Sequence, residues 1–311
     1  IAFIGTATGF VESTLAQIYK ISRGHGLFHG GPAYYIQNAL GQPAVAKLFA
    51  VLISVTFGLI YVSVQANTIA LSMEKAFGID TWVMGAVLAI LSGAVIFGGI
   101  QRVANFSTLL VPVMAGIYLL IAAIIIVLHI DQVPAMFALI LHDAFSPQAA
   151  VGGGIGTAIL TGIRRGLFSN EAGEGSIPNA AATANVTHPV KQGLVQAFGV
   201  YVDTWIVCSA TAFIVLLTGQ YTIGGDTTGI ALAQDSLASA FGPWASSLLA
   251  VLIFLFAFSS VVGNYYYGEI NIHFITENTK PALFAYRLAV VAMVFFGCVA
   301  AFGLVWNLAD L

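Results

Sequence analysis

Long apolar segments separated by short polar stretches run through the whole chain. A helix of about 20 apolar residues spans the ~30 Å hydrocarbon core of a bilayer. This pattern predicts an all-α fold, a polytopic membrane helix bundle with eight spans. The predicted spans lie near residues 1–18, 47–71, 82–100, 106–130, 133–163, 193–218, 244–267 and 283–308.

The segment 133–163 departs from this simple pattern. It is too long for one span, and Gly152, Gly153, Gly154 and Gly156 lie near its middle. Each glycine costs a helix up to about 1 kcal/mol relative to alanine, and three in a row exceed what close helix packing requires. Backbone inside a bilayer leaves the helix only where protein or a water-filled cavity satisfies its polar groups. The segment therefore predicts a helix that is broken at the glycines, beside a solute site.

The basic residues predict one orientation for these spans. Positive charge concentrates in cytoplasmic loops, and only Lys75 of the ten basic residues falls on the opposite side. The loop 219–243 is then external, and its residues 230–240 have a helical pattern. The nine residues assigned to the cytoplasmic side are Lys20, Arg23, Lys47, Arg102, Arg164, Arg165, Lys191, Lys280 and Arg287.

Composition excludes several classes of protein. Hydrophobic residues make up 59% of the 311 residues and charged residues only 7%, whereas soluble domains are about 25% charged. No basic patch with interleaved aromatics predicts nucleic-acid binding, and no hydrolase, metalloprotease or phosphate-binding motif predicts an enzyme. Cys208 and Cys298 lie in apolar segments and predict neither a disulfide framework nor a metal site. Because the chain opens inside an apolar segment, we expect residues 1–311 to form a single transmembrane domain within a longer protein.

Four acidic residues inside the predicted spans are functional candidates, because ionisable groups are rare in a bilayer. Glu12 is equally well read as a packing carboxylate bonded to a neighbouring helix. Asp143 lies near the glycine break, where freed backbone donors could hold it. Asp203 and Glu269 lie nearer the cytoplasmic ends of their spans, which favours a structural or interfacial charge.

Uncharged polar residues within the spans offer further candidates. Gln65 and Asn67 are mid-span amides, which usually join helices and would line a cavity only if their helix faces the broken one. Ser259 and Ser260 form a hydroxyl pair, a common helix contact that also suits a hard monovalent cation. Broken membrane helices place half-helix N-termini at carboxylates and free carbonyls at cations. An amino acid and a coupling ion therefore match this chemistry.

At these residues the chain resembles the alanine/glycine:cation symporter family, the sodium:alanine symporters. The resemblance runs through nearly the whole chain. Its most specific part is the run 166–173, GLFSNEAG, because that order of residues has no generic packing explanation. The matching residues are Glu12, Leu15, Ala16, Tyr19, Lys20, 30–36, 65–67, 98–100, 165–173, Gly175, Ser176, Asp203, Thr204, 265–269, Val305, Trp306, Ala309 and Asp310.

The resemblance implies the five-plus-five inverted-repeat transporter fold of the amino acid–polyamine–organocation type. About eight of about eleven helices are then present, helices two to nine, with 133–163 as the broken sixth. It also implies sodium-coupled symport of a small neutral amino acid of the alanine/glycine type by alternating access. The expected partners are Na⁺ and the lipid bilayer, with no other cofactor, in the cytoplasmic membrane of a prokaryote. A monomer is expected.

Residue roles follow from the same resemblance. Gly153, Gly154, Ile155 and Gly156 would form an unwound segment that holds the substrate's amino and carboxylate ends. Gln65, Ser260 and Asn264 would complete the substrate cavity, and Ser259 with Ser260 would bind Na⁺. In the cytoplasmic gate, Glu171 would pair with a nearby arginine. The gate and structural candidates are Glu12, Asn67, Asp143, Arg165, Asn170, Glu171, Asp203 and Glu269.

Three residues depart from the family pattern, and other functions stay open. Gly154 stands where an aromatic is frequent, Asn264 where tryptophan is usual, and Glu174 is also unusual. A larger or more polar pocket would accept a side chain larger or more polar than that of alanine.

The alternative within transport is proton coupling through Glu12 or Asp143. A polytopic membrane enzyme or a non-transporting amino-acid receptor is the alternative from another class.

Overall fold

The computed structural model describes residues 2–24, 27–98, 100–144, 154–222, 225, 227–276 and 279–310. Within them, every regular element is a helix except one antiparallel hairpin of strands β1 (Ile21–Ser22) and β2 (Phe28–His29). The predicted all-α class is confirmed. The chain is a multi-pass membrane protein, because six described helical segments are long and apolar enough to cross a membrane. They are Pro43–Phe77, Thr81–Gly98, Val111–Leu128, Pro189–Thr218, Pro243–Thr276 and Lys280–Val299.

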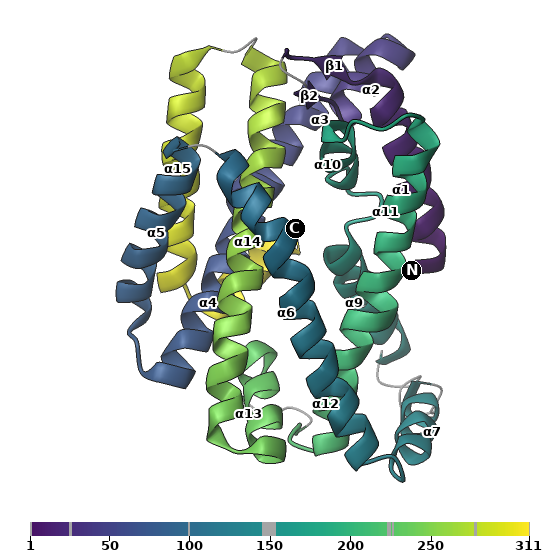
Figure 1. Cartoon of the computed structure of the whole chain (residues 1–311), viewed down its shortest axis with the longest axis vertical. Helices are drawn as coiled ribbons and strands as arrows, with labels where there is room; N and C mark the ends of the chain where they lie inside the picture. Colours follow the sequence, from purple (N-terminus) through teal and green to yellow (C-terminus); the bar gives the residue numbers. More distant parts are fainter. Residues whose placement is uncertain are drawn as a thin grey trace.

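The first half of the chain forms a series of long helices joined by short turns (Figure 1). Prolines at Pro32 and Pro43 start two of them, since proline's fixed φ suits the first helical turn and its missing N–H is not needed there. The span from Pro43 contains a π-helical turn, η1. The elements are α1 (Ala2–Tyr19), α2 (Pro32–Leu40), α3 (Pro43–Val55), η1 (Thr56–Tyr61), α4 (Val62–Phe77), α5 (Thr81–Gly98) and α6 (Ile100–Leu128).

The second half contains the interrupted helices. A second π-helical turn, η2, lies within the span from Pro189 to Thr218. The predicted helix at 230–240 is confirmed as α13. The elements are α7 (Val133–Ala144), α9 (Gly154–Asn170), α10 (Ile177–Thr183), α11 (Pro189–Tyr201), η2 (Val202–Cys208), α12 (Ser209–Thr218), α13 (Gly229–Phe241), α14 (Pro243–Thr276), α15 (Lys280–Val299) and α16 (Phe302–Ala309).

Three predicted spans differ from the structure. The segment 1–18 is helical as α1 but is not one of the six apolar segments, because Glu12 and Gln17 make it more polar. The described residues of the segment 133–163 form two helices, α7 and α9. The last span is also two helices, α15 and α16, with extended backbone at Ala300 and Ala301 between them.

One buried side-chain amide stabilises the break between α15 and α16. Asn67 on α4 donates from Nδ2 to the carbonyl oxygens of Gly297 (2.9 Å) and Ala300 (3.0 Å). The last carbonyls of a helix have no partner within it, so Asn67 satisfies the end of α15. Its role in the described structure is structural.

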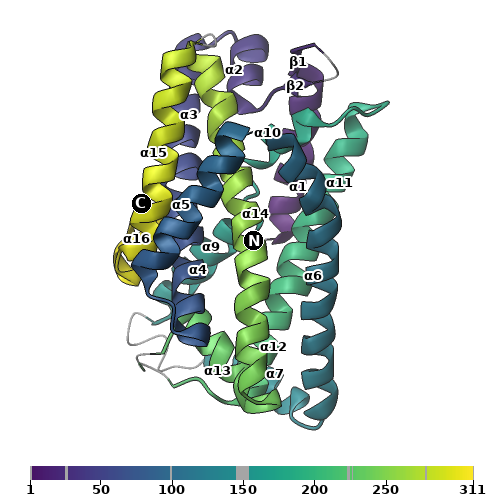
Figure 2. The same ribbon diagram turned by 60° about the vertical axis from the view of Figure 1, so that its left-hand side comes forward.

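Helix α14 joins two hydrophobic clusters and forms the central column of the bundle (Figures 1 and 2). Its 34 residues correspond to about 51 Å. One cluster packs its Ala257, Val261 and Tyr265 against α4, α5 and α15. The other packs its Ala245 and Leu249 against α6, α12 and α13. The two halves of the chain therefore share one core through α14.

Tyr286 of α15 occupies a space that only glycines leave open. Its hydroxyl donates to the Ser54 carbonyl oxygen (3.1 Å). A Cβ at either Gly58 of η1 or Gly268 of α14 would overlap the same hydroxyl oxygen. These two glycines thus set the distance between η1, α14 and α15.

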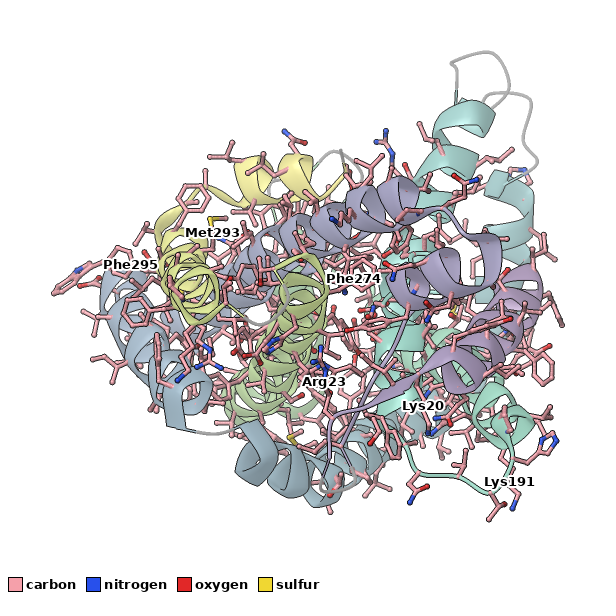
Figure 3. All side chains as sticks on the ribbon, turned by 90° about the horizontal axis from the view of Figure 1, so that it is seen from above. Lys20, Arg23, Lys191, Phe274, Met293 and Phe295 are labelled. Carbon is pink, nitrogen blue, oxygen red and sulfur yellow. The ribbon has the colours of Figure 1, made fainter. Side chains whose placement is uncertain are left out.

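The basic residues divide between the two ends of the molecule. Lys20 follows α1 and Lys191 lies in the first turn of α11, at the end that carries α2 and the hairpin (Figures 1 and 3). Lys75 lies at the opposite end, where it pairs with Asp235 of α13 (2.6 Å). Arg164 and Arg165 lie inside helix α9, not in the loop that the sequence predicted.

Candidate functional site

The described residues of the fifth predicted span, 133–163, form two helices. Helix α7 ends at Ala144 and α9 begins at Gly154. Residue Gly153 lies outside the described residues. Gly154, Ile155 and Gly156 belong to the first turn of α9, so the prediction that they form an unwound segment is wrong. The first N–H groups of a helix lack partners within it and carry partial positive charge, so this end of α9 can hold a carboxylate.

Packing does not require the glycine at position 156. A Cβ added there would meet no heavy atom within 4 Å among the described residues. Close packing against another helix was the alternative explanation for the glycine cluster. Among the described residues, Gly156 makes no such contact.

The other end of α9 runs into a polar connection, residues 171–176, that reaches α10. Glu171 has φ 54, a left-handed conformation that costs a non-glycine residue energy. The Ser176 hydroxyl donates to its Oε2 (2.5 Å). The Gly173 backbone N–H donates to the Glu12 carboxylate of α1. Glu12 thus binds a neighbouring segment, as its packing interpretation predicted.

Two π-helical turns flank this connection. From η1, the Tyr61 hydroxyl donates to Glu174 Oε2 (3.3 Å). From η2, Asp203 Oδ2 accepts from the Ser169 hydroxyl (2.5 Å), and the Thr204 hydroxyl accepts from Asn170 Nδ2 (3.0 Å). A π-helical turn adds one residue to an α-helix and often occurs at functional sites. Here each one turns a polar side chain toward the C-terminal end of α9.

Ionisation of the connection is unfavourable. Burial raises the pKa of Glu171 to about 7; the Ser176 hydrogen bond opposes this, and the charges of Glu174 and Asp203 add to it. Burial also raises the pKa of Glu174, which the Tyr61 hydroxyl partly offsets. Desolvation disfavours the charged form of a carboxyl. The connection therefore holds one carboxyl, that of Glu171, that can exchange a proton near neutral pH.

The arginines of α9, Arg164 and Arg165, pair with a residue other than the predicted Glu171. Arg165 Nη2 donates to Asp310 Oδ1 beyond the end of α16, and Arg164 Nη1 lies 3.8 Å from Asp310 Oδ2. Among the described residues neither arginine pairs with Glu171, so the predicted Glu171–arginine pair is wrong. The ion pair instead joins α9 to α16.

An aromatic column lies beside this ion pair. The Arg165 guanidinium lies 4.6 Å from the Trp306 ring centre. Ring centres are 5.0 Å apart between Trp306 and Phe168, 4.7 Å between Phe168 and Tyr61, and 5.9 Å between Trp306 and Phe302. The aromatic column is Phe302, Trp306, Phe168 and Tyr61, and it connects α16, α9 and η1.

The predicted substrate and ion ligands lie on the central helices. Gln65 is half-buried on α4, and Asn264 is buried on α14. Ser259 and Ser260 on α14 both donate to the Phe256 carbonyl oxygen (2.7 and 3.2 Å), which leaves their lone pairs able to accept or to bind a cation. In the described part of the chain no hydrogen bond joins these side chains to one another.

Two acidic candidates lie apart from the connection. Asp143 is exposed at the end of α7, where His142 Nδ1 lies 3.1 Å from its Oδ1. Glu269 of α14 accepts from Arg287 Nη2 of α15 (2.5 Å), and Arg287 Nε donates to the Tyr265 hydroxyl (3.0 Å). The ion pair of Glu269 joins α14 and α15, as a structural role for this residue would require.

Sequence reasoning brought Glu12, Asn170, Glu171 and Asp203 into one list, and the structure places them around the same connection. It missed the contacts made by Tyr61, Trp306 and Asp310. The last two were matched only as family residues, and no spacing along the chain relates them to Arg165. Their proximity follows from the fold of α16 against α9.

Comparisons with known proteins show what the whole chain is similar to. The model of the sodium:alanine symporter family matches residues 1–311. The chain is 51% identical, over its full length, to the probable sodium/glutamine symporter GlnT of Bacillus subtilis (strain 168) and spans 64% of that protein. It is 52% identical to the amino-acid carrier protein AlsT of the same organism, of which it spans 66%.

A more distant relative carries a different name. The chain is 35% identical over its full length to the sodium/proton-dependent alanine carrier protein of Bacillus sp. (strain PS3), and it spans 73% of that protein. The family model covers every residue of the chain, including the connection, the broken helix and the Arg165–Asp310 pair. The chain belongs to the sodium:alanine symporter family.

Proposed function

We propose that the chain forms most of the transport core of a sodium-coupled amino-acid symporter in the cytoplasmic membrane. The observation that carries this proposal is that the described residues of one predicted span, 133–163, form two helices, α7 and α9, so that the N-terminal end of α9 falls within that span. Family membership and the names of the relatives support sodium and an amino acid as the transported pair.

In this proposal the helices follow the five-plus-five inverted-repeat fold, with α7 and α9 as the two halves of the broken sixth helix. The first turn of α9, from Gly154, holds the substrate carboxylate. Gln65 and Asn264 contribute polar groups to the cavity. Ser259 and Ser260 bind Na⁺ through lone pairs that their bonds to Phe256 leave free.

The substrate is proposed to be a neutral amino acid that includes glutamine-sized side chains. At Gly154 and Asn264 the family often has aromatic rings. A glycine and an asparagine there would make the substrate pocket larger and more polar. A relative that is 51% identical is named a sodium/glutamine symporter, which supports the larger pocket. Competition against radiolabelled alanine decides this: glutamine should compete with alanine, and competition by alanine and glycine alone would contradict it.

Sodium coupling is tested by uptake into proteoliposomes at fixed pH, with Na⁺ replaced by choline. Uptake should fall to background without Na⁺. Uptake that persists in choline and follows a pH gradient would instead establish proton coupling. A specific observation favours that second candidate: the pKa of Glu171 is raised to about 7 by burial. The relative named a sodium/proton-dependent carrier agrees with it.

A further inference from the structure

A cavity lies at the end of the molecule that carries α13, away from the connection 171–176. It is bounded by the C-terminal end of α4, the start of α13 and the first turn of α16, which meet at this end (Figure 2). Its volume is about 460 Å³, within the usual range of about 300–1,000 Å³ for small-molecule pockets. The lining residues are Leu71, Glu74, Lys75, Thr227, Thr228, Ile230, Ala231 and Phe302.

The wall from α4 carries one negative and one positive group. Lys75 Nζ is fixed by Asp235 (2.6 Å) and by the Ala231 carbonyl oxygen (3.0 Å). Glu74 precedes it and is exposed, and its carboxylate makes no side-chain hydrogen bond or ion pair with any described residue. Glu74 therefore presents a negative charge to the cavity that a cationic group could neutralise.

The opposite wall is the N-terminal turn of α13. Thr228 precedes this 13-residue helix and makes no side-chain cap. The first N–H groups of α13, near Ile230 and Ala231, therefore lack helical partners, and Thr228 does not cap them. This helix end attracts a carboxylate, and the Lys75 ammonium, which is already paired with Asp235, lies beside it.

The third wall is apolar. Leu71, Ile230 and Phe302 supply it. Gly229 has φ 58, and a Cβ at this position would lie 3.2 Å from the Phe302 ring. Glycine thus allows the start of α13 to approach the ring closely, so the aromatic surface forms a firm side of the cavity.

We propose that this cavity is an outer binding site for a free amino acid, a capture site for the substrate of the symporter. The substrate's ammonium pairs with Glu74. Its carboxylate lies at the start of α13 near Lys75, and its side chain contacts Phe302 and Leu71. A zwitterion with a modest side chain is the ligand class whose charges match both walls.

The location gives this site a role in transport. Phe302 is the first ring of the aromatic column, which continues through Trp306 to Phe168 and Tyr61. The cavity therefore lies at the Phe302 end of this aromatic column, beside which the Arg165–Asp310 pair lies. Its end of the molecule is external in the charge-based orientation. This inference rests on the proposed function, since it names the same substrate.

The test measures uptake of radiolabelled alanine and glutamine in intact cells that express Glu74→Gln. Because Glu74 is exposed, loss of its pairing with the ammonium, worth up to about 1 kcal/mol, should raise KM about three- to fivefold, while the maximal rate and the Na⁺ dependence stay close to those of the wild type. The matched control is Asp80→Asn, an exposed carboxylate at the same end but outside the cavity, which should leave KM unchanged.

A second variant protects the test against misfolding. Phe302→Ala should also raise KM, and thermal unfolding of both purified variants shows whether they fold. A KM within twofold of the wild type for a folded Glu74→Gln protein would overturn the outer site. An equal rise in KM for Asp80→Asn would also overturn it, because the rise would then come from losing any negative charge at this surface. Absence of Na⁺-dependent uptake in the wild type would instead refute the proposed function.

Discussion

At the scale of single residues, Glu171 combines a strained backbone with an unfavourable charge. Its φ of 54 and its bond from Ser176 hold the carboxyl in a largely buried position. Such strain persists only where the surrounding structure determines it. The neighbouring contacts of Tyr61 with Glu174 and of Asp203 with Ser169 provide that support.

This environment predicts the pH dependence of stability. Burial raises the pKa of Glu171 from 4.5 to about 7, so the folded protein keeps a proton that the unfolded chain has lost. Stability should therefore fall as pH rises between those two values. Glu171→Gln should flatten this fall in thermal unfolding midpoints measured from about pH 5 to about pH 8. Asp80→Asn is the control and should keep the wild-type trend; an unchanged slope in Glu171→Gln would contradict the prediction.

At the scale of elements, helices approach one another closely at a few positions where a side chain of one helix contacts the backbone of another. Asn67 closes the end of α15, and Tyr286 enters between Gly58 and Gly268. Regular helix is interrupted at η1, η2 and Ala300. At each of these places, polar groups from other segments contact either the backbone or a side chain of the interrupted turn. Intrinsic helix preference alone does not locate them.

Replacing Gly268 tests the packing of α14 against α15. Gly268→Ala places a methyl group on the Tyr286 hydroxyl oxygen, and overpacking of this kind costs about 1–3 kcal/mol. The thermal unfolding midpoint should fall, and Tyr286→Phe in the same chain should recover part of the loss. Gly116→Ala is the control, because its Cβ would meet no described atom within 4 Å. Equal destabilisation by both alanines would contradict the model.

At the scale of the whole molecule, α9 is joined to both halves of the bundle. Its C-terminal end contacts η1 and η2, and Arg165 joins it to α16 through Asp310. Alternating access requires such contacts to break and re-form as helices move. The Arg165–Asp310 pair is partly exposed, so it can open at modest cost.

Exchange of the two charges tests this coupling. Asp310→Asn should lower Na⁺-driven uptake up to about fivefold, since a partly exposed ion pair contributes up to about 1 kcal/mol. Arg165→Asp combined with Asp310→Arg should restore uptake relative to either single variant, which a purely local packing role would not predict. Strictly additive losses in the double variant would show that the two residues act independently.

By itself, the sequence determined the membrane class, the all-α fold, most of the long helices and the interruption near the glycine cluster. These follow from apolar length and from glycine's poor fit to a helix, which are local properties. It also singled out Glu12, Asn170, Glu171 and Asp203, although not their shared neighbourhood. The tertiary structure alone decided the partners: Arg165 with Asp310, Asn67 with the end of α15, and Lys75 with Asp235 of α13. Such pairs join segments far apart in the chain, and their geometry depends on how the helices pack.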